Sequence, residues 1–141
     1  MKNKIIISII ILAALFTYAV LPDSCDIEPC YVNGIKAIIE RENISIDSDS
    51  LVYFEMEGTN EVLENEVLEG LIKALDMPKF VDDRDEAEYR FIIKESRVRR
   101  FFAQVDIDVS DGMYGDSRYR IRLKYRNHQW VVTSIENIWV S

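Results

Sequence analysis

The chain has 141 residues, of which 25 are acidic and 17 are basic, so its formal net charge is −8. The charge is divided unevenly, because residues 20–88 carry 19 acidic and 5 basic side chains whereas residues 89–141 carry 6 acidic and 10 basic ones. A phosphate backbone would repel most of such a chain, which argues against nucleic acid as a partner. The acidic part could bind a basic protein, although acidic surface also serves simply to keep a small exported protein soluble.

The first 19 residues have the pattern of a secretory signal peptide. Lys2 and Lys4 precede an apolar run from Ile5 to Phe16, and small residues at 17 and 19 favour cleavage after Ala19. Two alternatives stay open: residues 5–21 as an uncleaved membrane anchor, and lipidation of Cys25, for which Pro22 departs from the usual signal. All three predict export to the periplasm or the exterior.

Residues 20–32 are interpreted as a tether that carries the two cysteines of the chain, Cys25 and Cys30. In an oxidising compartment this spacing predicts a short-range Cys25–Cys30 disulfide. Two cysteines and the distant His128 are fewer ligands than a structural zinc site requires, so we expect no metal. The sequence also shows no cofactor motif.

Residues 33–141 are predicted to form a single α+β domain. A first helix is expected over 33–42 with Asn33 as its cap, followed by a strand over 51–57. The clearest helix covers 61–76, because its apolar side chains recur on one face and Asn60 can cap it. Pro78 then prevents its continuation.

The remainder of the chain alternates like antiparallel strands. After a strand that begins at Tyr89, further strands are expected over 97–110, 117–126 and 129–140, with a tight Asn127-His128 turn before the last one. The expected architecture is therefore N-terminal helices packed on a curved antiparallel sheet of four to five strands.

The strand over 117–126 carries a basic stripe on one face. An apolar-to-apolar register would set Asp108 opposite Arg120 and Asp106 opposite Arg122. The candidate binding residues are Arg118, Arg120, Arg122, Lys124 and Arg126 on this strand, of which Arg118, Lys124 and Arg126 would lack a partner in the hairpin. The stripe could hold an anionic lipid, a glycan or an acidic protein group, or it could be an ordinary solvated face.

The last 45 residues resemble the end of an NTF2-like (cystatin-like) domain. The resemblance rests on the segment 99–109, the segment 119–125 and a closing strand that begins Gln129-Trp130-Val131-Val132. It implies a long strand, a hairpin and a closing strand packed against helices. Separately, residues 80–82 and 87–91 resemble strand openings in small cell-envelope proteins that begin with a β-α-β unit.

Three functional hypotheses follow, and no catalytic motif favours an enzyme. The first is an exported domain that binds another macromolecule, in one version an inhibitor or immunity-type protein. The second, implied by the resemblance, is an NTF2-like domain or enzyme that binds a small molecule, with Glu136 pointing inward near Tyr119. The third is a membrane-apposed assembly or secretion factor that binds anionic lipid. Exposed Val131 and Ile135 would also permit a homodimer.

Overall fold

The computed structural model describes residues 2–20, 27–111 and 115–140. In chain order its elements are α1 (Lys2–Val20), α2 (Glu28–Arg41), β1 (Leu51–Met56), α3 (Glu61–Ala74), β2 (Lys79–Phe80), a short 3-10 helix η1 (Arg84–Glu86), β3 (Tyr89–Val98), β4 (Phe102–Ser110), β5 (Asp116–Arg126) and β6 (Gln129–Val140). The expected α+β class is confirmed.

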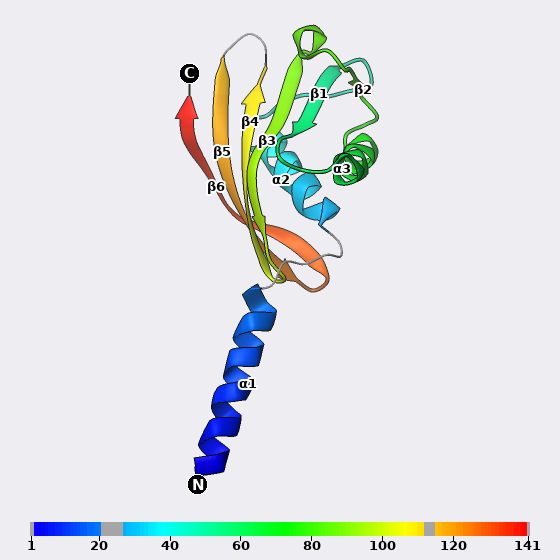
Figure 1. The fold of residues 1–141 in the computed structure, drawn as a ribbon. Coiled ribbons are helices and arrows are strands. Elements are labelled where there is room, and N and C mark those ends of the chain that lie inside the picture. The colour runs from blue at the N-terminus through cyan, green and yellow to red at the C-terminus, as the bar shows by residue number, and fades with distance from the viewer. Residues whose placement is uncertain (1, 21–26, 112–114, 141) are drawn as a thin grey trace.

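The strands form one mixed six-stranded sheet in the order β2-β1-β3-β4-β5-β6 (Figure 1). The strands from β3 to β6 form an antiparallel meander, as expected. The expectation of a wholly antiparallel sheet is wrong, because β1 pairs in parallel with both β2 and β3. The cause is the crossover helix α3, which returns the chain to the same end of the sheet before β2 begins.

Both α2 and α3 lie on the same face of the sheet (Figure 1). α2 packs against β4, β5 and β6, while α3 packs against α2 and β1. The core is apolar and fills the space between the helices and the sheet; among its fully buried side chains are Ile35, Ile38, Val67, Leu71, Phe91, Ile107 and Ile121. No described helix covers the opposite face of β3–β6, which we call the outer face.

α2 begins five residues before the expected start of the first helix. Pro29 stands in its first turn, where a missing N–H costs nothing. Asn33 is therefore not a cap but a residue of the second turn, and its side-chain amide donates to the backbone oxygen of Trp130 at 2.9 Å. The tether between α1 and the domain is correspondingly shorter than expected.

Cys30 is a free thiol buried in the core, with no exposed surface. The expected Cys25–Cys30 disulfide is therefore absent from this structure, because the first turn of α2 directs Cys30 into the core; Cys25 lies outside the described residues. Burial raises the pKa of the Cys30 thiol to about 12.

This burial predicts a specific alkaline instability. The unfolded thiol loses its proton near pH 9 while the folded one keeps it to about pH 12, so stability present below pH 9 is lost as the pH rises between these values. In the Cys30→Ala variant, the free energy of unfolding should fall less steeply over this window, as measured by urea denaturation at several pH values. Equal slopes in both proteins would contradict the burial of Cys30.

The second helix and the last turn agree with the sequence. The side chain of Asn60 accepts a hydrogen bond from the Leu63 N–H at 2.8 Å, so it caps α3 as expected. β5 and β6 are joined by Asn127 and His128, which both have positive φ angles, as a tight hairpin turn requires.

α1 stands apart from the core. The large apolar side chains from Ile5 to Phe16 are each more than half exposed, and no residue from Lys2 to Phe16 belongs to the core cluster. Within the described residues, no helix is long and apolar enough to cross a membrane. All the core residues among the described side chains follow α1.

Candidate functional site

The β4–β5 pairing differs by two residues from the expected register. Asp108 lies opposite Arg118, and Asp106 lies opposite Arg120. The faces are nevertheless those expected, because a slip of two residues keeps every side chain on its own side of the sheet. Arg122 consequently faces Gln104 rather than Asp106, and the expected set of unpaired cations changes.

Two of the candidate residues are neutralised in the middle of the outer face. Arg120 forms two hydrogen bonds of 3.0 Å with the carboxylate of Asp106, and Arg118 binds Asp108 in the same two-point manner. These hydrogen bonds raise the pKa of both arginines above its ordinary value. Arg118 was expected to be free and is not. We call these four residues the charge ladder.

At the end of the outer face nearest the β3–β4 turn, the cations do not lie opposite acidic side chains within the described strands. One row across the strands joins Arg97, Gln104 and Arg122, and the next row joins Phe102 and Lys124, with Arg99 hydrogen-bonded through its backbone N–H to the Phe102 oxygen. These two rows carry four cations. We call Arg97, Arg99, Arg122 and Lys124 the basic end.

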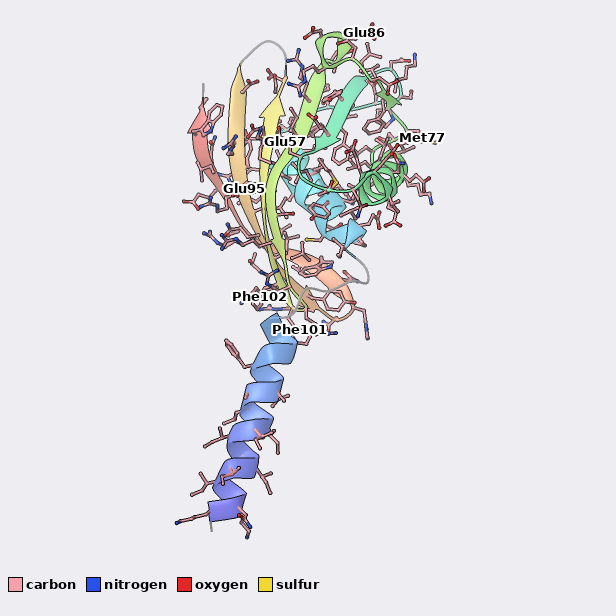
Figure 2. All side chains as sticks on the ribbon, viewed as in Figure 1. Glu57, Met77, Glu86, Glu95, Phe101 and Phe102 are labelled. Atoms are coloured by element: carbon pink, nitrogen blue, oxygen red, sulfur yellow. The ribbon has the colours of Figure 1, made fainter. Side chains whose placement is uncertain are left out.

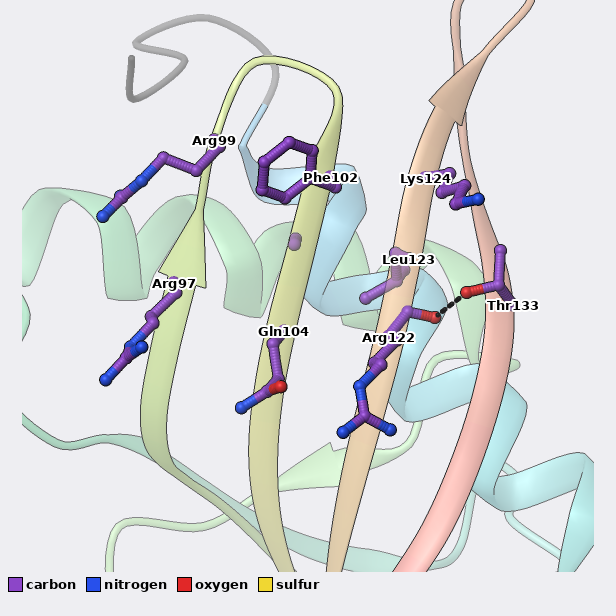
Figure 3. A pocket seen from close by; sticks show the side chains of 9 residues that line it. Arg97, Arg99, Phe102, Gln104, Arg122, Leu123, Lys124 and Thr133 are labelled. Atoms are coloured by element: carbon purple, nitrogen blue, oxygen red, sulfur yellow. Dashed lines mark hydrogen bonds between the residues drawn. The ribbon is translucent and has the colours of Figure 1, made fainter. Parts of the chain in front are cut away.

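A hollow of about 420 Å³ lies over these rows (Figure 3). Arg97, Gln104 and Arg122 project from three neighbouring strands toward the same side (Figure 3). Phe102, Ala103, Leu123 and Thr133 complete the lining together with Arg99 and Lys124. Among the described residues, this lining contains no carboxylate, so the hollow combines apolar lining residues with an excess of positive charge.

The cations of the basic end are weakly paired. Arg122 lies 3.5 Å from Glu136, and both side chains are about half exposed, so the attraction is small. Within the described part of the chain, the guanidinium of Arg99 donates only to the backbone oxygen of Val98. Among the described side chains, Arg97 and Lys124 have neither an ion-pair partner nor a side-chain hydrogen bond. An anionic group that entered the hollow would meet donors that are not already occupied.

The other two sequence candidates lie beside the hollow rather than in it. Arg126 is exposed at the end of β5, where it pairs through the backbone with Gln129. Glu136 does not point inward near Tyr119, as the enzyme hypothesis required. It lies opposite Arg120 on the exposed outer face, whereas Tyr119 is buried on the helix-facing side.

Arg97 and Arg99 were not among the binding residues predicted from the sequence. The signal was present, because Arg97-Val98-Arg99 alternates like a strand and places both arginines on one side. The predicted strand over 97–110 assigned both arginines to the wrong strand. In the structure β3 ends at Val98 and β4 begins at Phe102. The intervening turn, Arg99-Arg100-Phe101, contains no glycine, proline, asparagine or aspartate to mark it.

Two cations toward the other end of the sheet, Arg84 and Lys94, are paired with acids. Arg84 binds Glu55 at 2.8 Å, and Lys94 binds Glu57 at 2.6 Å. The described residues include no cluster of histidine, cysteine and acidic side chains that could hold a metal ion. Comparisons with protein-family models, curated proteins and solved structures found no match. The geometry of the basic end is therefore the main guide to function.

Proposed function

We propose that this chain is an exported binding domain without catalytic activity, and that its basic end holds an anionic group of a macromolecule. The observation that carries the proposal is the hollow itself. Four cations line it without a carboxylate, in a chain whose net charge is −8. The four cations repel one another unless an anion lies between them. Their arrangement therefore favours binding of an anionic group.

The leader supports the export part of the proposal. Positive residues before an apolar run are the feature that export machinery recognises, and the described side chains of α1, from Lys2 to Phe16, lie outside the core. The neutralised charge ladder supports the absence of catalysis on this face, because its carboxylates are held by arginines rather than directed at a substrate. The proposed pairing of Glu136 with Tyr119, on which the enzyme hypothesis depended, is not formed.

An NTF2-like relationship is a further part of the proposal. The long antiparallel meander from β3 to β6, packed against α2, supports it. The parallel pairs formed by β1 lie outside the expected pattern and fit the β-α-β opening of small cell-envelope proteins better. Either relationship is compatible with a binding domain, because fold alone does not determine function.

Pyrophosphate is a suitable probe of the basic end, since it presents several anionic oxygens in a small volume. We expect it to bind to the exported domain in isothermal titration calorimetry at low salt. The Arg97→Gln/Lys124→Gln variant should bind about ten-fold more weakly, because each exposed charge pair contributes up to about 1 kcal/mol. Glu136→Gln should bind slightly more tightly, because it releases Arg122.

The matched control removes two cations elsewhere. Lys73→Gln/Lys79→Gln changes the net charge by the same amount but alters α3 and β2, which lie at the opposite edge of the sheet from β5 and β6. If this control weakens binding as much as the Arg97/Lys124 variant, pyrophosphate is responding to overall charge. The proposed site would then be wrong.

A further inference from the structure

The basic end lies beside an exposed pair of aromatic side chains. Phe101 and Phe102 are 43% and 45% exposed at the turn between β3 and β4. Their backbone is firmly held, because the Phe101 oxygen accepts from the Tyr125 N–H at 2.8 Å and the Phe102 oxygen accepts from the Arg99 N–H at 2.9 Å. The two rings are therefore presented on a rigid turn. We call residues 99–102 the hairpin tip, in which Arg99 and Arg100 precede the two phenylalanines.

The acidic surface of the domain is directed elsewhere. Glu86, in the acidic segment that contains η1, lies at the opposite end of the domain from Phe101 and Phe102 (Figure 2). The exposed acidic side chains of α3, which include Glu61 and Glu69, lie on the helix-bearing side of the sheet. A negatively charged surface would repel those regions and attract the hairpin tip. The domain would therefore approach such a surface with the hairpin tip first.

The start of α2 lies at the same end of the domain as the hairpin tip. Tyr31, in the first turn of α2, bonds through its hydroxyl to Ser96 near the end of β3 at 2.8 Å. Only residues 21–26 separate α1 from the described start of the domain at Ile27, and such a stretch of chain spans at most about 25 Å. A retained leader would therefore hold this end of the domain within about 25 Å of α1.

From these three observations we propose that the hairpin tip and the basic end dock on an anionic phospholipid surface. The phosphate of a lipid headgroup lies in the hollow among Arg97, Arg122 and Lys124, while Phe101 and Phe102 enter the boundary between headgroups and acyl chains. Exposed arginine, at Arg126, adds to the attraction. This inference rests on the proposed function and specifies the class of macromolecule that supplies the anion.

The chemistry favours lipid over an acidic protein. Cations near an anionic membrane gain attraction without needing an exact partner geometry, and aromatic side chains become buried at the same depth. At the hairpin tip, the segment from Val98 to Phe102 combines two arginines with three apolar residues and contains no acid. A protein acid would account for the cations but would leave the two phenylalanines without a role.

The test is cosedimentation of residues 20–141 with vesicles, because every core residue among the described side chains lies within this part of the chain. We expect binding to vesicles that contain roughly one third phosphatidylglycerol, and loss of binding to pure phosphatidylcholine. At about 1 M salt, where charges are screened beyond roughly 3 Å, binding should disappear. Absence of binding at low salt would overturn the lipid proposal.

Two variants test whether the basic end and the two phenylalanines make the contact with the vesicle. Arg97→Gln/Lys124→Gln should lower the partition coefficient about thirty-fold, since each cation near an anionic surface contributes a factor of roughly five. Phe101→Ser/Phe102→Ser should lower it about ten-fold at unchanged charge. Thermal unfolding would check that both variants fold, and Lys73→Gln/Lys79→Gln should bind as the parent does. Equal losses in all three variants would contradict the site.

Pyrophosphate binding separates the two proposals. A domain that binds pyrophosphate at the basic end but ignores phosphatidylglycerol vesicles retains the proposed function and excludes the lipid surface as its partner. A domain that binds neither loses both proposals. Vesicle binding that survives Arg97→Gln/Lys124→Gln, with normal loss of pyrophosphate binding, would place the lipid contact elsewhere and overturn this inference alone.

Discussion

Replacing Gly34 with leucine should destabilise the domain by about 3 kcal/mol, because the new side chain has no space between α2 and the sheet. Gly34 is buried on the sheet-facing side of α2. A Cβ atom at this position would lie 3.5 Å from the Cδ1 of Ile121 and 3.8 Å from the Cδ1 of Ile107. The remaining atoms of leucine would therefore overlap fully buried side chains of β4 and β5.

The matched control is Gly34→Ala. Its Cβ would make an ordinary van der Waals contact, and alanine is favoured over glycine inside a helix by about 1 kcal/mol. Chemical denaturation should therefore show Gly34→Ala to be as stable as the parent or more so. If Gly34→Leu unfolds at the same denaturant concentration as the parent, α2 does not pack on β4 and β5 as described.

Replacing Arg120 with methionine should lower the free energy of unfolding more than any other single change in the charge ladder, because it leaves the carboxylate of Asp106 without its partner. The side chain of Asp106 is only 7% exposed, so water replaces the two lost hydrogen bonds only in part. By contrast, the side chain of Asp108 is 20% exposed. The equivalent Arg118→Met change should therefore cost about 1 kcal/mol, since that carboxylate regains water.

The double variant Asp106→Leu/Arg120→Met tests the cause. Removing both charges leaves nothing unsatisfied, so its stability should return to within about 1 kcal/mol of the parent. Urea denaturation of the four proteins at neutral pH provides the comparison. Equal costs for Arg120→Met and Arg118→Met, or no recovery in the double variant, would contradict the burial of the Asp106 carboxylate.

Local patterns predicted the elements better than their pairing. The helix capped by Asn60 and the strand over 129–140 follow directly from periodicity and turn chemistry, and the structure confirms them. The parallel pairing of β1 could not be predicted, because β2 is only two residues long and leaves no periodic signal. Parallel pairing is set by where α3 lies in space, which is information beyond the local sequence.

Part of the candidate site was predictable for the same reason. Alternation placed Arg122 and Lys124 on the outer face, and the structure confirms this. Alternation fixes only the side of the sheet, however, and the two-residue difference in register decided that Arg118 is paired. Arg97 joins the site because β3 lies beside β4, and that long-range contact depends on a turn without the usual turn residues.

The most direct test of the central claim is an NMR titration that follows the Nε–Hε signals of the arginine side chains as pyrophosphate is added. We predict progressive shifts for Arg97, Arg99 and Arg122, which line the hollow. Arg118 and Arg120 should keep their signals, because Asp108 and Asp106 already occupy their donors. Equal shifts for all five arginines, or no shift for any of them, would contradict a specific anion site at the basic end.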